Sequence, residues 1–148
     1  MKDKDFRKDT CFATGHNAPE WHISNIASVL AGGLACGLYT TSSPEALAYK
    51  VTHSRADILV IEDGEQLDKV REAGAGVVVQ WEGEPGEGAI SWAELLEIGR
   101  EESDEILTRR MEDQAVNMAC MLVYTSGTTG WCLTNFYVPC SCPYFGVQ

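Results

Sequence analysis

The sequence predicts an α/β fold: a partial parallel sheet with helices on both faces. Two observations carry this prediction. Short runs of apolar and β-branched residues, each about as long as a buried strand, recur along the chain. Between them lie segments that open with helix-start signals and carry apolar residues at helical spacing. Alternation of this kind is typical of β-α-β units, in which helices join parallel strands and cover the sheet.

The first helix is expected to start at Asn17, which we interpret as its N-cap, with Pro19 in the first turn. Glu20, three residues after Asn17, completes a pattern like a capping box. The helix should end before Gly32-Gly33, and a short strand should follow over 35–40. Small residues on this helix would let a neighbouring element lie close to it; they are Ala27, Ser28, Ala31 and Gly32.

A second helix is expected from Ser43-Pro44-Glu45, where Ser43 is the cap and Pro44 occupies the first position, to about His53. Ser91-Trp92-Ala93-Glu94 has the spacing of a capping box, so a further helix should begin there and reach Gly99. The other expected elements are a buried strand over 57–61, a short helix over 65–72, a buried strand over 77–81, a helix over 103–113, and a buried strand over 119–124 that ends at Thr125.

The composition is that of a globular protein. The chain has 148 residues, which suits one domain or part of a larger one, and 45% of them are hydrophobic. The net charge is −11. Between Glu62 and Glu105 there are 14 acidic and 3 basic residues, which together account for −11, so the rest of the chain sums to zero. This acidic balance argues against nonspecific binding to nucleic acid, which requires clustered Lys and Arg.

Targeting signals and metal sites are not evident in the sequence. Residues 1–11 form a charged leader with no apolar stretch after it that would suit a signal peptide, and no segment is long enough to span a bilayer. We expect a cytoplasmic chain with reduced thiols; contact with the surface of the endoplasmic reticulum membrane is left open. Cys132, Cys140 and Cys142 lack the spacing of a zinc site, and no residue is singled out as catalytic.

The segment Tyr124–Gly130, read YTSGTTG, follows the last expected strand. It places four hydroxyls and two glycines in the six residues that follow Tyr124. Glycines let backbone N–H groups approach an anion, and hydroxyls add donors for phosphate oxygens. The segment is not the GxxxxGK[ST] loop, because no Lys follows its second Gly. From composition alone, a Ser/Thr/Gly surface turn remains an equally good interpretation.

The string itself resembles the phosphate-loop motif of the adenylate-forming (AMP-binding) superfamily, which includes acyl-CoA synthetases and luciferases. Residues 16–63, which begin HNAPEW and contain GLYTTSSPE, resemble the N-terminal part of long-chain fatty-acyl-CoA synthetases, most closely the bubblegum subfamily. The resemblance covers about residues 12–130, a partial AMP-binding domain. It does not extend to residues 131–148, an uncharged tail without clear helical or strand periodicity.

The resemblance implies a ligase that joins a long-chain fatty acid to coenzyme A, using ATP and Mg²⁺ and releasing AMP and pyrophosphate. It assigns the ATP phosphates to Thr125, Ser126, Gly127, Thr128, Thr129 and Gly130. The family motif continues with Pro-Lys-Gly, whereas this chain continues with Trp131-Cys132-Leu133. The family strand that precedes the first helix corresponds here to residues 9–14, where we assign no strand.

These departures lead us to expect a truncated N-terminal part of such an enzyme that makes no acyl-CoA by itself. An alternative from another class is a non-catalytic isoform that binds a partner, or an unstable by-product. An incomplete sheet leaves unpaired edges and uncovered apolar faces that could serve a partner or promote aggregation. A third alternative is a residual nucleotide binder of millimolar affinity, on the order of 4 kcal/mol.

Overall fold

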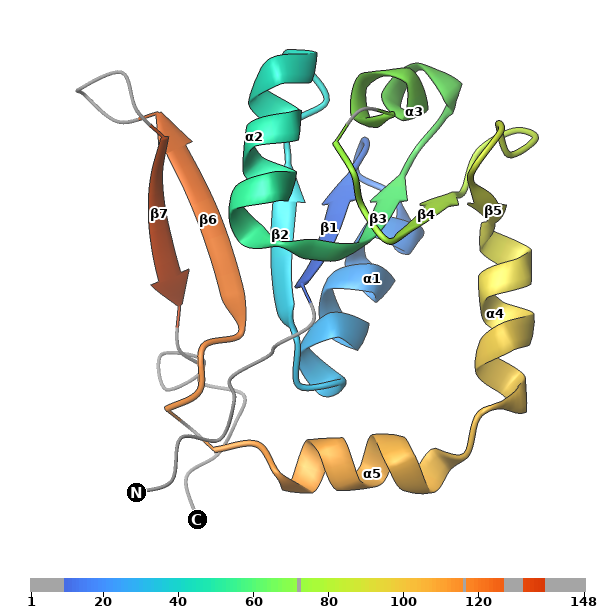
Figure 1. Cartoon of the computed structure of the whole chain (residues 1–148). Coiled ribbons are helices and arrows are strands. Elements are labelled where there is room, and N and C mark those ends of the chain that lie inside the picture. The colour runs from blue at the N-terminus through green and yellow to red at the C-terminus, as the bar shows by residue number, and fades with distance from the viewer. Residues whose placement is uncertain (1–9, 72, 116, 127–131, 138–148) are drawn as a thin grey trace.

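The computed structural model describes residues 10–71, 73–115, 117–126 and 132–137. Figure 1 shows one twisted sheet with helices on both of its faces. The strands are β1 (Thr10–Thr14), β2 (Leu34–Leu38), β3 (Ala56–Ile61), β4 (Val77–Gln80), β5 (Ile90–Ser91), β6 (Met121–Ser126) and β7 (Cys132–Tyr137). The helices are α1 (Pro19–Leu30), α2 (Pro44–Ser54), α3 (Gly64–Val70), α4 (Trp92–Glu101) and α5 (Asp104–Glu112). The predicted α/β class is confirmed.

The sheet order is β5-β4-β3-β1-β2-β6-β7. β1 to β6 are parallel to their neighbours, and β7 pairs antiparallel with β6. From β1 the chain passes through α1 to β2 on one side, and then through α2 to β3 on the other side of β1 (Figure 1). The strand order therefore reverses around β1. In open α/β sheets this reversal point, at the carboxyl ends of the strands, is where ligands bind.

Three strands were not predicted. β5 (Ile90–Ser91) lies where we expected only the start of a helix, and it pairs with β4. β1 lies where we assigned no strand, and it is in register with both β2 and β3. β7 falls in the tail that showed no strand periodicity, and its six residues pair with β6 from Met121↔Tyr137 to Ser126↔Cys132. The pattern of apolar residues did not predict these strands, because the segments are short and their conformation is set by pairing with neighbouring strands.

The predicted helix starts are partly confirmed. Ser43 caps α2 by accepting a hydrogen bond from the Ala46 N–H, and Ser91 caps α4 in the same way. The prediction for α1 is wrong: its N-cap is Ala18, and no side chain caps it. The Asn17 side-chain oxygen lies 2.8 Å from Nε2 of His22 instead, so the capping-box pattern with Glu20 is not formed.

The side chains divide into two clusters on opposite faces of the sheet. Because successive residues of a strand point to opposite faces, Leu59 and Ile61 of β3 contribute to one cluster and Ile58 and Val60 to the other. The first cluster lies under α2 and α3 and holds most of the buried residues. The second has three buried members, Ala13, Val60 and Val79, surrounded by half-buried Trp21, Trp81, Trp92 and Leu95 among others. The two faces are therefore packed to different extents.

Among the described residues, no helix combines the length and the hydropathy needed to cross a bilayer.

Candidate functional site

A cavity opens at the carboxyl edge of the sheet, where β2 and β6 separate. The two strands pair only at Ala35↔Met121 and Cys36↔Leu122. Beyond these pairs the strands diverge and leave a cavity of about 380 Å³. The cavity adjoins the reversal point at β1 and runs beside the strand that leads into the YTSGTTG segment. Topology and volume therefore identify the same place as a candidate ligand site.

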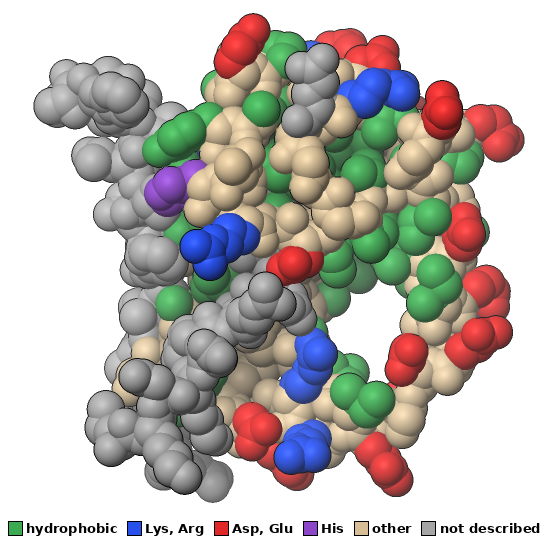
Figure 2. Space-filling model, viewed as in Figure 1, with side chains coloured by type: hydrophobic (Ala, Val, Ile, Leu, Met, Phe, Trp, Pro, Cys, Tyr) green, Lys and Arg blue, Asp and Glu red, His purple; other side chains and the backbone are tan. Residues whose placement is uncertain are grey.

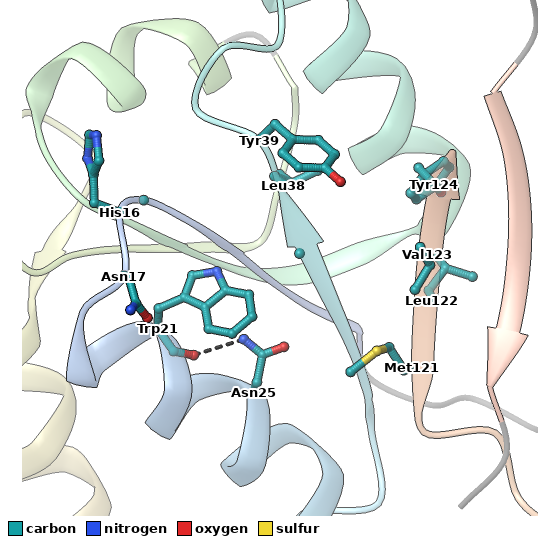
Figure 3. Close-up of a pocket in the computed structure, with 12 residues that line it drawn as sticks. His16, Asn17, Trp21, Asn25, Leu38, Tyr39, Met121, Leu122, Val123 and Tyr124 are labelled. Atoms are coloured by element: carbon teal, nitrogen blue, oxygen red, sulfur yellow. Dashed lines mark hydrogen bonds between the residues drawn. The ribbon is translucent and has the colours of Figure 1, made fainter. Parts of the chain in front are cut away.

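The cavity is lined by residues that follow β1, by residues at the end of β2, by β6 and by α1. Figure 3 shows the indole of Trp21 and the amide of Asn25 on the α1 side, and the phenol of Tyr39 just after β2. The Asn25 amide donates to the Trp21 carbonyl oxygen at 2.8 Å, which fixes its orientation on the helix. The other lining residues are Gly15, His16, Asn17, Gly37, Leu38 and four consecutive residues of β6, Met121, Leu122, Val123 and Tyr124. The wall is mostly apolar, with a few amide and ring groups.

The predicted phosphate-binding residues begin inside β6. Thr125 and Ser126 form its last two positions and pair with Leu133 and Cys132 of β7. The strand therefore continues one residue past its predicted end at Thr125. Gly127, Thr128, Thr129 and Gly130 lie outside the described residues, so their assignment to ATP phosphates stays a prediction.

Tyr124 directly precedes the predicted phosphate-binding residues, and its side chain is anchored through its hydroxyl group. It is buried, and its hydroxyl donates to the Lys50 carbonyl oxygen at 3.3 Å. The same hydroxyl lies 2.9 Å from Nδ1 of His53, whose ring stacks on Tyr49 at 5.5 Å between centroids. Because a hydroxyl has one proton to donate, His53 Nδ1 is the donor when both bonds are present. α2 thus holds the strand that carries the phosphate segment.

A charged pair lies at the same edge of the sheet. Glu62 follows β3, and its Oε2 accepts from the His16 backbone N–H at 3.1 Å and contacts the His16 Nδ1 at 2.8 Å. The hydrogen bond that the Glu62 carboxylate accepts from the His16 ring, and then the negative charge of Glu62, raise the pKa of His16 above the ordinary 6.5. The imidazole is exposed, so the pair links the ends of β1 and β3 at the surface.

The described residues bring together no group of three or more His, Cys, Asp or Glu side chains that could hold a metal ion. Sequence reasoning did not identify Trp21, Tyr39 and Tyr124 as residues that line a cavity. Their positions could have indicated this role, because these residues lie near the carboxyl ends of adjacent strands.

Comparison with known proteins agrees with this geometry. The model of the family described as AMP-binding enzyme matches residues 6–131. The long-chain-fatty-acid–CoA ligase ACSBG1 of Rattus norvegicus is 40% identical over 124 residues, which are 78% of this chain and 17% of the rat protein. The long-chain-fatty-acid–CoA ligase ACSBG2 of Homo sapiens is 35% identical over 124 residues, 78% of this chain and 19% of that protein. The chain thus spans less than a fifth of the length of these relatives.

Solved structures share the fold at low sequence identity. The luciferase-like enzyme from the mealworm Zophobas morio superimposes with a TM-score of 0.71 at 17% identity, covering 89% of this chain and 31% of that one. The anthranilate CoA ligase AuaEII gives a TM-score of 0.68 at 19% identity, covering 89% and 25%. The expected resemblance to adenylate-forming enzymes is confirmed, and the chain belongs to the AMP-binding enzyme family.

Proposed function

We propose that this chain is the phosphate-binding part of an ATP-dependent long-chain fatty acid–CoA ligase. In that reaction the fatty acid attacks the α-phosphate of ATP, pyrophosphate leaves, and the thiol of coenzyme A then displaces AMP from the acyl-adenylate. The role assigned to this chain is to hold the β- and γ-phosphates through backbone N–H groups and hydroxyls of Thr125–Gly130. A cytoplasmic location is part of the proposal.

One observation carries the proposal. The YTSGTTG segment begins at the carboxyl end of β6, beside the cavity at the strand-order reversal. In open α/β sheets ligands bind outside the carboxyl ends of the strands. Here the strand is held on α2 by the hydrogen bond from the Tyr124 hydroxyl to the Lys50 carbonyl oxygen. The similarity to ligases of the same named activity supports the choice of substrates.

The 148 residues alone are proposed to bind ATP weakly and to form no acyl-CoA. The sequence Trp131-Cys132-Leu133 supplies no cation after the loop, and backbone donors without a cation give an affinity in the millimolar range, on the order of 4 kcal/mol. The described residues supply no cluster of ligands for Mg²⁺. Calorimetric titration with MgATP should therefore show a Kd of about 1 mM or weaker. A micromolar Kd would contradict this point.

The proposal is tested by transplantation. Residues 12–130 of this chain replace the matching residues of the rat ligase, and the chimera is assayed for oleoyl-CoA formed from oleate, ATP and coenzyme A. The identity of 40% makes the exchange structurally reasonable. We expect activity that depends on ATP, because the transplanted segment supplies the phosphate loop.

The matched control is the same chimera with Thr128→Ala and Thr129→Ala. Loss of both hydroxyls should lower kcat/KM by about 100-fold, the usual scale for removing donors that stabilise charge in a transition state. Thr108→Ala, at an exposed threonine of α5 that does not line the cavity, serves as the surface control. A folded chimera without activity, or one in which the double substitution leaves kcat/KM unchanged, would rule out the proposed role of the loop.

A further inference from the structure

The side chain of Tyr124 links β6 to α2 through two polar contacts. Its hydroxyl donates to the Lys50 carbonyl oxygen at 3.3 Å and lies 2.9 Å from Nδ1 of His53. The ladder between β2 and β6 ends at Cys36↔Leu122, two residues before Tyr124. Past that pair, the polar link between β6 and the α2 side of the sheet therefore comes from a side chain and not from the ladder with β2.

These contacts define which ring nitrogen of His53 carries the proton. A carbonyl oxygen can only accept, so the single hydroxyl proton of Tyr124 is directed at Lys50. Nδ1 of His53 must then supply the proton of the second hydrogen bond. A neutral imidazole has one ring proton, so Nε2 is left without one. The surroundings of His53 therefore select its Nδ1–H tautomer.

Two aromatic rings hold the imidazole in this orientation. Tyr49, about one helical turn before His53, stacks on it with 5.5 Å between ring centroids and 23° between ring planes. The Tyr124 ring meets it in a T-shaped arrangement at 5.9 Å and 76°. Tyr124 is buried, whereas His53 is exposed. Figure 2 shows a histidine side chain at the surface over α2, next to hydrophobic side chains. The imidazole thus reaches from the surface to a buried hydroxyl.

Packing alone does not require this hydroxyl. The Tyr124 ring belongs to the same buried cluster as Leu47 and Val51 of α2, so a phenylalanine ring would satisfy the apolar contacts. A buried hydroxyl costs free energy unless it is hydrogen-bonded, and both of the partners described above come from α2. Hydrogen bonds depend on direction, whereas apolar burial does not. The two bonds therefore set where β6 lies along α2, which apolar contact would leave less defined.

We propose that His53, as its Nδ1–H tautomer, is a positioning residue for the end of β6 and acts through Tyr124. Thr125 and Ser126 are the next two residues of that strand, and they are the first two residues assigned to the ATP phosphates. His53 sets their backbone position without touching the substrate. The effect on ATP rests on the proposed function, whereas the positioning of β6 does not.

The tautomer is tested on the 148-residue chain by ¹H–¹⁵N correlation spectra of the imidazole rings at pH 8. The chain has three histidines, and His53→Ala identifies the signals of His53. We expect the proton on Nδ1. Tyr124→Phe removes the acceptor and keeps the ring, so the Nδ1–H fraction should fall. A proton on Nε2 in the parent chain, or the same tautomer populations in Tyr124→Phe, would overturn the proposal.

Positioning is tested by hydrogen exchange of the same chain. In His53→Ala and in Tyr124→Phe, the amides of residues 125–126 should exchange about tenfold faster, because the strand end loses an anchor. The amides of β3 should keep their rates, which shows that the variant is folded. Thr52→Ala, at an exposed residue of α2 beside His53, is the matched control. Unchanged exchange at residues 125–126, or equal acceleration throughout the sheet, would contradict positioning by His53.

The consequence for ATP is tested on the chimera described above. His53→Ala should raise KM for ATP about fivefold, the scale of one lost hydrogen bond, and should leave KM for oleate unchanged. A loss of folded enzyme would lower kcat and leave both KM values as they are, so the split separates positioning from stability. His53→Asn should restore KM for ATP, because its amide nitrogen is as many bonds from Cβ as Nδ1 is. His53→Gln, whose amide nitrogen is one bond farther, should not.

The double variant closes the test. His53→Ala combined with Tyr124→Phe should raise KM for ATP no more than Tyr124→Phe alone, because both substitutions act through one hydroxyl. Additive effects, or equal changes in KM for ATP and oleate, would overturn the proposal. A chimera without activity would count against the ligase proposal, and the tautomer and the exchange rates would still decide whether His53 positions β6.

Discussion

The two faces of the sheet differ in how completely they are covered. Under α2 and α3, Leu47, Leu59 and Ile61 are each 0% exposed, and a single cluster joins both helices to the strands. On the opposite face, α4 and α5 contribute no buried residue. The difference teaches that an element can form by its own capping signals while its apolar face still lacks a partner. The following substitutions test that comparison, from the largest expected effect to the smallest.

The largest difference in the free energy of unfolding is expected between two Leu→Ala substitutions, one on each face of the sheet. Leu47→Ala removes a side chain that is fully buried in α2, and we expect a loss of about 3 kcal/mol in the free energy of unfolding. Leu96→Ala, on the open face of α4, should cost less than about 1 kcal/mol. Urea denaturation followed by circular dichroism measures both values. Equal losses would mean that the two faces are equally packed.

Two glycines give the next comparison. A Cβ at Gly76 would lie 2.9 Å from the Asp57 carbonyl oxygen, a backbone atom that cannot rotate away. Gly76→Ala should therefore cost about 1–3 kcal/mol. A Cβ at Gly99 in α4 would meet nothing within 4 Å. Gly99→Ala should raise stability by up to about 1 kcal/mol, through better helix propensity. Destabilisation by Gly99→Ala, measured by the same denaturation, would show that the space beside α4 is already filled.

Helix caps test a smaller difference. Ser43 accepts from the Ala46 N–H at 3.3 Å, so Ser43→Ala should cost about 1 kcal/mol in unfolding free energy. Asn17 does not cap α1, and its side-chain oxygen lies 2.8 Å from Nε2 of exposed His22, so Asn17→Ala should cost less than about 0.5 kcal/mol. Thermal melts of both variants against the parent chain provide the measurement. A larger loss of stability for Asn17→Ala than for Ser43→Ala would support the predicted N-cap at Asn17.

The smallest expected effect is on pH dependence. The pKa of His16 is raised in the folded state by Glu62, so the pair stabilises the fold fully below pH 6.5 and loses its contribution as pH rises through the folded pKa. An NMR titration of the His16 ring should show this raised value. Glu62→Gln should bring the pKa back toward 6.5, whereas Glu84→Gln, in the loop before β5, should not. An unchanged value in Glu62→Gln would remove Glu62 as the cause.

The sequence predicted elements better than it predicted their environments. Ser43 and Ser91 were recognisable because a cap is a local bond within four residues. β1, β5 and β7 were missed because each is held by pairing with another strand of the sheet. The candidate loop was visible as a motif, but the cavity beside it was not. Trp21 and Tyr39 come together with β6 only through the reversal of strand order around β1.

Hydrogen exchange of the purified 148-residue chain tests the central claim most directly. The claim is that one face of the sheet is covered by well-packed helices, whereas α4 and α5 on the other face contribute no buried side chain. We predict slow exchange at Ile58–Ile61 and Val77–Val79, where parallel pairing is covered by buried side chains. Residues 92–112, which form α4 and α5, should exchange at least 100-fold faster, because they lack buried side chains. Equal protection of α4, α5 and β3, or uniformly fast exchange throughout, would contradict the account.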